Sequence, residues 1–122
     1  MAGSNGDAVE LSRWEYAVSA RGEAYLVQEI RKARMSLQAV AKLERAMKRL
    51  EDGQARAFEH ERLRNDIHEL RVNIDKRWYR VFYAVEGQSF VALGLLVKKQ
   101  NKVDKRSIDT AERRLKEHRS SR

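Results

Sequence analysis

The sequence predicts a single α+β domain: one strand, a two-helix hairpin, a three-stranded antiparallel meander and a C-terminal helix. Three observations favour this fold class. Apolar residues recur every three or four positions between residues 22 and 53, and the spacing changes to strict alternation after residue 64. A third is size, because 122 residues, of which 42% are hydrophobic and none is cysteine, suffice for one core without disulfides.

The predicted domain spans residues 13–118. Residues 1–12 are small and polar, with two glycines and no periodicity, so they predict a flexible leader. Residues 119–122 predict a short basic tail. The chain has no apolar run of membrane-spanning length and no secretory signal pattern, so we expect no membrane partner and a cytoplasmic location.

The N-terminal half predicts one strand and two helices. A loose alternation predicts a strand over residues 13–19, and helical spacing predicts a helix over residues 22–34. Ser36 can cap a second helix, and Gly53 suits the position just after its end. The apolar positions of the second helix are Leu37, Val40, Leu43, Met47 and Leu50.

The second half predicts three strands and a helix, after a polar connection over residues 54–64. Alternation over residues 68–74 predicts a strand with one apolar face, and residues 78–85 predict an aromatic strand. A turn leads to residues 89–97, which are apolar on both faces and therefore predict a covered central strand. The expected polar face of the first of these strands consists of Glu69, Arg71 and Asn73.

Asp104 can cap the last helix. Ile108, Ala111 and Leu115 have the spacing of a buried stripe. The residues expected to face water are Arg113, Arg114 and Lys116.

The charge is concentrated in the second half. The chain has 26 Lys and Arg against 18 Asp and Glu, a formal charge of +8 and a pI near 10.0. Residues 1–60 carry 10 basic and 9 acidic residues, so nearly all of the excess follows them. Either this charge solvates the surface, or it converges on a face that binds a polyanion.

Several kinds of chemistry are excluded. His60, His68 and His118 are widely spaced and cysteine is absent, so we expect no metal site and no cofactor. The glycines fall singly, which excludes a glycine-rich phosphate loop, and no Gly-x-Ser-x-Gly motif occurs.

The remaining candidates for a functional site are cations on the predicted strands. Arg80 interrupts an apolar aromatic strand, where it is costly to bury unless an anion pairs with it. That anion is either a carboxylate such as Glu69 or a phosphate, which a guanidinium binds in a bidentate manner. A cationic site of this kind, with few carboxylates, can also cleave RNA without metal, because the ribose 2′-OH is an internal nucleophile.

Three segments resemble the HigB-like, phage-derived Gp49-like branch of the RelE/ParE toxin superfamily. They are Asp66-Ile67-His68-Glu69-Leu70-Arg71-Val72, Trp78-Tyr79-Arg80-Val81-Phe82-Tyr83, and residues 96–111 from Leu96-Val97-Lys98-Lys99 to Ile108-Asp109-Thr110-Ala111. The resemblance covers residues 63–118, and residues 13–53 match by architecture only. Leu96 replaces a usual aromatic residue, and Val103-Asp104 replaces a usual Thr-Pro.

The resemblance implies a toxin that cleaves mRNA on the ribosome, leaves a 2′,3′-cyclic phosphate and is neutralised by a cognate antitoxin, for which a helix-turn-helix protein is one option. Arg80 looks like the arginine at the scissile phosphate and Arg71 like a second cation, while Tyr79 or Tyr83 could stack a base or relay a proton. His118 falls where some relatives place an acid–base residue. Lys98 and Lys99 resemble the basic strand end that holds the RNA backbone, and they belong to the expected catalytic set with Arg80, Arg71, Tyr79 and His118. The further expected RNA contacts are Lys102, Lys105, Arg106 and Tyr83.

Two alternatives stay open. One branch of the superfamily inhibits gyrase, so the chain could be a non-catalytic toxin with a protein target. It could also be a basic module that only docks on RNA or DNA phosphates. If the chain is a toxin that cleaves mRNA, we expect Arg71, Arg80, Lys98 and Lys99 to face one RNA phosphate region.

Overall fold

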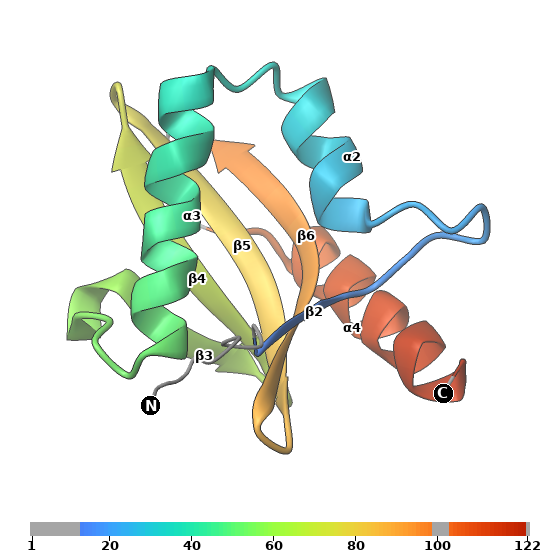
Figure 1. Cartoon of the computed structure of the whole chain (residues 1–122). Coiled ribbons are helices and arrows are strands. Elements are labelled where there is room, and N and C mark those ends of the chain that lie inside the picture. The colour runs from blue at the N-terminus through green and yellow to red at the C-terminus, as the bar shows by residue number, and fades with distance from the viewer. Residues whose placement is uncertain (1–12, 99–102, 122) are drawn as a thin grey trace, which may run out of the picture.

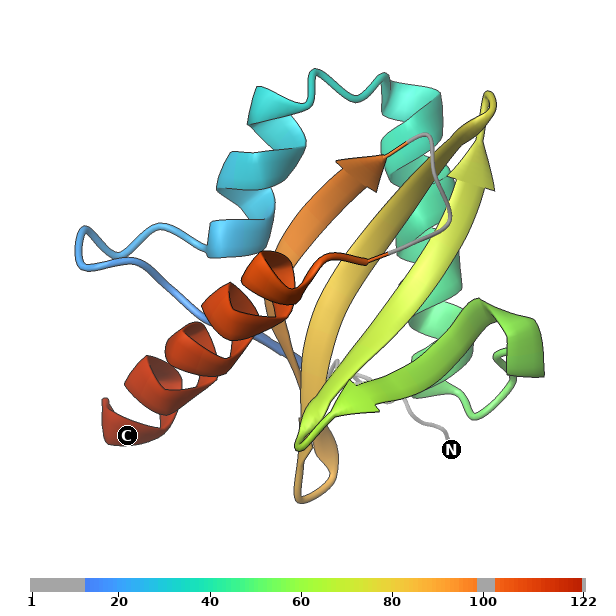
Figure 2. The ribbon, with the colours of Figure 1, turned by 180° about the vertical axis from the view of Figure 1, so that it is seen from behind.

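A five-stranded sheet lies at the centre of the protein, with helix α3 (Leu37–Glu51) on one face (Figure 1) and helix α4 (Lys105–Ser120) on the other (Figure 2). The computed structural model describes residues 13–98 and 103–121. In chain order the elements are β2 (Trp14–Tyr16), α2 (Tyr25–Lys32), α3 (Leu37–Glu51), the 3-10 turn η1 (Ala57–Glu59), β3 (His60–Arg64), β4 (Ile67–Ile74), β5 (Arg77–Glu86), β6 (Ser89–Lys98) and α4 (Lys105–Ser120). The predicted α+β class is confirmed.

The strands lie in the order β2-β6-β5-β4-β3. Strands β3 to β6 form an antiparallel meander, and β2 pairs parallel to β6. The meander therefore has one more strand than the sequence predicts. The added strand, β3, reads His-Glu-Arg-Leu-Arg, because an edge strand is protected by charge and need not show apolar alternation.

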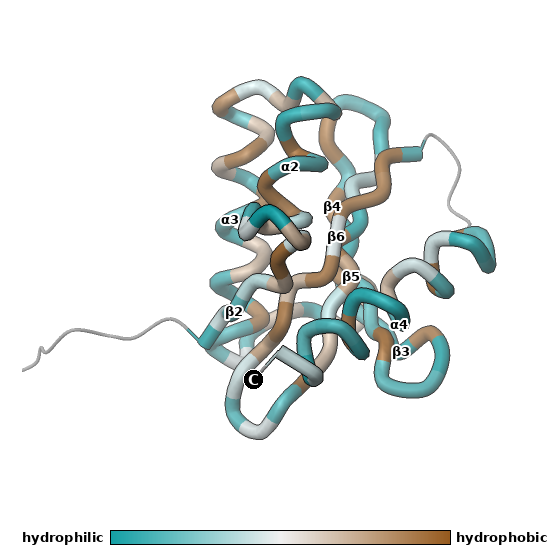
Figure 3. Tube along the Cα trace, turned by 90° about the vertical axis from the view of Figure 1, so that its right-hand side faces the viewer, coloured by the Kyte–Doolittle hydropathy of each residue, from teal (hydrophilic) through white to brown (hydrophobic). Residues whose placement is uncertain are grey.

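Each face of the sheet has its own core. On the α3 side, Leu43 and Met47 of the helix pack with Leu70 and Val81 of the sheet. On the α4 side, the core consists of Ala17, Ile67, Phe82, Ala84, Val91, Leu93, Ala111 and Leu115. Strand β6 contributes to both cores, so its two apolar faces are covered as predicted, and Figure 3 shows hydrophobic residues along the central strands.

Side-chain caps fix the starts of the two longer helices. Ser36 Oγ accepts a hydrogen bond from Ala39 N at 3.1 Å, and Asp104 Oδ1 accepts one from Ser107 N at 2.8 Å. Gly53 follows α3 with a φ of 73°, a conformation that favours glycine. Both predicted caps and the predicted helix end are confirmed.

No helix in the described residues combines the length and the apolar character needed to cross a membrane.

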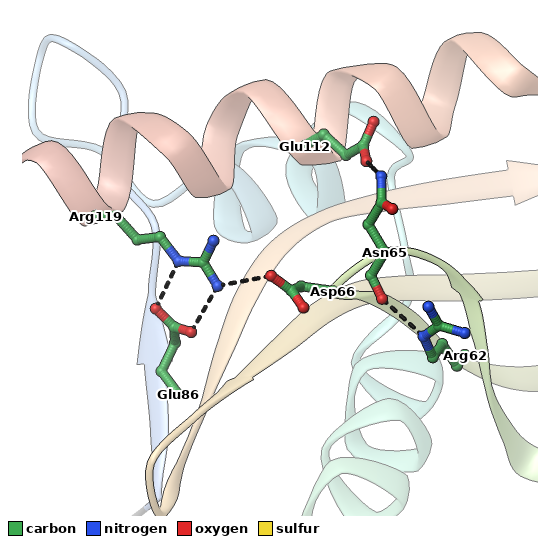
Figure 4. A network of polar contacts seen from close by, with 6 residues as sticks. All are labelled: Arg62, Asn65, Asp66, Glu86, Glu112 and Arg119. Atoms are coloured by element: carbon green, nitrogen blue, oxygen red, sulfur yellow. Dashed lines mark hydrogen bonds and ion pairs between the residues drawn. The ribbon is translucent and has the colours of Figure 1, made fainter.

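Polar contacts hold the C-terminal half of α4 against two turns of the sheet (Figure 4). Arg119 forms hydrogen bonds with both carboxylate oxygens of Glu86 at 2.9 Å and with Asp66 at 3.1 Å. Asn65, in the turn between β3 and β4, donates to Glu112 at 2.6 Å. Because α4 continues to Ser120, Arg119 is part of the helix and not of a free basic tail.

Arg114 does not face water as predicted, because its side chain is only 14% exposed. Its guanidinium binds both carboxylate oxygens of Glu29 from α2 and the carbonyl oxygen of Leu93, and lies 4.0 Å over the ring of Tyr25. Glu29 Oε1 in turn accepts a hydrogen bond from the backbone N–H of Leu95. This contact between α2, β6 and α4 has room only because β6 has glycine at position 94.

We expect Gly94→Ala to destabilise the protein by about 1 kcal/mol, the low end of the cost of overpacking, because the atoms that must move are the ends of two side chains. The added Cβ would overlap Arg114 Nη1 and lie 2.6 Å from Glu29 Oε1. Chemical denaturation measures the change in unfolding free energy. In an Arg114→Ala background the same substitution should cost clearly less, whereas an equal cost in both backgrounds would contradict this origin.

Stability should fall between pH 7.5 and 5.5 because of His68. Burial lowers the pKa of His68 from its ordinary value of 6.5, and the positive charge of Arg62 acts in the same direction. As the pH falls, the unfolded chain therefore takes up the proton on His68 before the folded protein does. The stability that neutral His68 contributes is fully present above about pH 6.5 and is lost as the pH falls through the pKa of His68 in the folded protein. The melting temperature of His68→Phe should change less between these pH values; an identical change in both proteins would contradict the assignment.

Candidate functional site

Three cations lie on the α4 side of the sheet, in neighbouring strands. Arg71 of β4 is the direct cross-strand partner of Arg80 of β5. Trp78, two residues from Arg80, is the partner of Lys98 on β6. Because direct partners and residues two apart share a face, Arg71, Arg80 and Lys98 share one. We call these three residues the cation row.

Glu69 lies between the two arginines of the row. Its Oε1 accepts from Arg80 Nη1 and is 3.5 Å from Arg71 Nη1. Of the two anions that the sequence leaves open for Arg80, the structure therefore shows the carboxylate of Glu69. Glu69 is not on a solvated polar face, because its side chain and that of Arg80 are each 1% exposed. Directly opposed guanidiniums repel each other, and the shared carboxylate allows them to lie side by side.

The remaining cations of the row are also paired. Arg71 donates to Glu61 Oε1 at 2.8 Å and to the carbonyl oxygen of Phe58 at 2.7 Å. Lys98 Nζ donates to Asp104 Oδ2 at 2.7 Å, and this bond is the largest cause that holds the pKa of Asp104 well below its ordinary value. Contrary to the expectation of few carboxylates, Glu61, Glu69 and Asp104 match the three cations in number.

The members of the row differ in their access to a ligand. The side chains of Arg71 and Lys98 are 20% and 32% exposed, whereas Arg80 is enclosed. Lys105 and Arg106, in the first turn of α4 next to Asp104, are exposed. A large anion can therefore reach Arg71, Lys98 and this helix start directly, while Arg80 contacts Glu69 behind them.

The structure does not bring the predicted tyrosines to the row. Tyr79 and Tyr83 belong to the core on the α3 side, so they lie on the opposite face of the sheet from Arg80. Tyr83 stacks on His68 with ring centroids 5.2 Å apart, and burial raises its pKa to about 12. Neither phenol is placed to stack a base or relay a proton beside the cations.

His118 also lies away from the row. It is 13 residues beyond Lys105 on α4, about 20 Å along the helix axis at 1.5 Å per residue. Its Nε2 is 3.5 Å from Glu15 Oε1 of β2, and its side chain is 13% exposed. Two further predicted contacts, Lys99 and Lys102, lie outside the described residues.

Sequence reasoning missed two residues that contact the row. Glu61 lies on the unpredicted strand β3, and its position follows from the register that pairs it with Glu69. Asp104 is predicted only as a helix cap, although its second oxygen binds Lys98. The proximity of Lys98 and Asp104 in sequence is a signal that could have found this pair.

Within residues 13–98 and 103–121, no group of three or more His, Cys, Asp or Glu is placed to hold a metal ion.

A comparison with models of protein families identifies a relationship for most of the chain. The family model described as phage-derived protein Gp49-like (DUF891) matches residues 28–116. The matched range extends from α2 into α4 and includes the whole cation row. No curated protein matches the chain.

Proposed function

This chain belongs to the phage-derived Gp49-like family, and from that premise we propose that it is the toxin of a toxin–antitoxin pair and cleaves mRNA on the ribosome without a metal. Membership of this family fits a protein with a cognate antitoxin, and we propose a helix-turn-helix protein in that role. The observation that carries the proposed activity is the cation row, with two reachable cations held on strands beside the basic start of α4.

The geometry suits the transition state of RNA cleavage. The ribose 2′-oxygen loses its proton and attacks phosphorus, and the bond from phosphorus to the 5′-oxygen breaks. The leaving 5′-oxygen takes up a proton, so the products are a 2′,3′-cyclic phosphate and a 5′-hydroxyl. Negative charge builds up on the phosphate oxygens in between, and positive groups already fixed in place stabilise it. In this proposal Arg71 and Lys98 provide that charge to the scissile phosphate.

The strands supply the rigidity that such a site needs. Arg71 is fixed by bonds to Phe58 and Glu61, and Glu69 links it to the enclosed Arg80. Arg80 is thus a positioning residue in this proposal, which acts on the phosphate through Glu69 and Arg71. Lys105 and Arg106 would hold the neighbouring RNA backbone, a contact that depends on charge alone.

Induction of the protein in a bacterial host, with growth measured and the 5′ ends of messages mapped, tests this function. We expect arrested growth and new message ends, and we expect both to disappear in the double variant Arg71→Ala, Lys98→Ala. A matched control is Lys42→Ala, Arg45→Ala, which removes the same charge from exposed positions on α3, on the other side of the sheet.

Other outcomes identify the alternatives. Arrested growth with intact messages and DNA damage would favour a toxin that acts on gyrase. A protein that binds RNA but produces neither arrest nor new ends would be a docking module. In that case affinity should fall in steps with every basic residue removed, and not mainly at the cation row.

A further inference from the structure

Two carboxylates and two guanidiniums form neighbouring cross-strand pairs in β3, β4 and β5. Glu61 is directly opposite Glu69, and Arg71 is directly opposite Arg80. Like charges in direct opposition destabilise a sheet. The carboxylate pair and the guanidinium pair are therefore each stabilised by the opposite charge of the other. Arg71 is the residue that contacts both carboxylates, at 2.8 Å for Glu61 and 3.5 Å for Glu69.

The two carboxylates differ in burial. The Glu69 side chain is 1% exposed, and a buried carboxylate that loses its cationic partners is strongly unfavourable. The Glu61 side chain is 52% exposed on the edge strand β3, so it can leave Arg71 and become hydrated at little cost. Glu69 is thus a fixed counterion of Arg71, and Glu61 is a replaceable one.

Lys98 has a counterion of the same replaceable kind. The Asp104 side chain is 47% exposed and binds Lys98 through Oδ2, while Oδ1 caps α4. Release of Lys98 would therefore leave the helix cap intact. At both cations, a carboxylate oxygen occupies a position in which a phosphate oxygen would form the same charge-assisted hydrogen bond.

We propose that Glu61 and Asp104 are exchangeable counterions that occupy the phosphate positions at Arg71 and Lys98 in the free protein, and that an RNA phosphodiester backbone replaces them on binding. This inference rests on the proposed function, because it describes how the substrate enters the same site. The two carboxylates lower RNA affinity, and Glu69 stays with the arginines throughout.

The test compares Glu61→Gln and Asp104→Asn with the control Glu44→Gln, an exposed position on α3. Each variant removes one negative charge, so the general electrostatic effect on RNA binding is matched. Asn caps a helix as well as Asp does, so Asp104→Asn should retain α4. The probe is a fluorescent 2′-O-methyl RNA oligonucleotide, which binds but has no free 2′-OH to react, and anisotropy gives the Kd over a range of salt concentrations.

We expect Glu61→Gln and Asp104→Asn each to bind about two- to fivefold more tightly than Glu44→Gln, as suits partly exposed ion pairs. Because the same cations neutralise the same phosphates in all of these proteins, the slope of log K against log salt should be shared, and the difference should lie in the affinity. If all three variants bind RNA with one affinity, the exchange is wrong while the proposed function stands. If neither the wild type nor any variant binds RNA, both the proposed function and the exchange are wrong.

Discussion

Arg80→Ala should lower the unfolding free energy by about 3–5 kcal/mol, the usual cost of leaving one partner of a buried ion pair. The side chains of Arg80 and Glu69 are each 1% exposed, so the remaining carboxylate would stay buried beside Arg71 alone. For a domain of this size the melting temperature should fall by more than about 10 °C. Chemical denaturation monitored by circular dichroism measures the free energy directly.

The double variant Glu69→Met, Arg80→Met is the control for this prediction. It removes both buried charges and fills the space with apolar side chains, which is often neutral or stabilising. We expect it to recover most of the stability that Arg80→Ala loses. If Arg80→Ala unfolds with the free energy of the wild type, then the Arg80–Glu69 pair is not the buried ion pair described above.

Lys98→Met should slow RNA cleavage by about 100-fold, the scale found when one fixed donor to a developing anion is removed. The Lys98 ammonium is reachable and is held by Asp104 at the start of α4, and methionine retains most of the length of the side chain but not its charge. Single-turnover cleavage of a ribosome-bound message at saturating protein measures the chemical step. Stability should change little, because the Lys98–Asp104 pair is partly exposed.

Lys42→Met is the matched control, since it removes one positive charge from an exposed position on α3. Its effect should be limited to weaker binding at low protein concentration, and saturating protein should restore the wild-type rate. Equal rates for Lys98→Met and the wild type at saturation would show that Lys98 does not act on the scissile phosphate.

The helices could be predicted well because their signals are local. The caps Ser36 and Asp104 and the glycine after α3 act within a few residues of themselves, and each occurs as predicted. Helix α2 begins at Tyr25, later than predicted, because Gly22 belongs to a turn in which its N–H bonds to the carbonyl oxygen of Ser19. That turn depends on the pairing of Val18 with Ala24, which apolar spacing does not reveal.

The strands could be predicted only in part, because their partners are distant in sequence. Strand β3 pairs through a turn in which Asn65 has a φ of 52°, and its charged sequence gives no alternation. The position of Glu61 beside Arg71 follows from that pairing and from nothing local. Arg114 was expected in water because a helical pattern does not show the Glu29 carboxylate that α2 brings to it.

The separation of the tyrosines from the cations was contained in the sequence. Adjacent residues of a strand point to opposite faces, so Tyr79 could not share a face with Arg80 in a regular strand. The structure bears out that alternation, with Tyr79, Val81 and Tyr83 in one core and Phe82 in the other. Motif resemblance places residues in a segment, and the period of the segment decides which of them can act together.

The chemistry of the RNA ends tests the central proposal most directly. A complex of ribosome and message is trapped first, and a metal chelator is then added. The purified protein is incubated with this complex, and the 3′ ends of the products are analysed. We expect 2′,3′-cyclic phosphate ends, formed by the wild type and by Lys42→Met but not by the double variant Arg71→Ala, Lys98→Ala. An intact message, 3′-hydroxyl ends, or unchanged cleavage by the double variant would contradict metal-independent cleavage at the cation row.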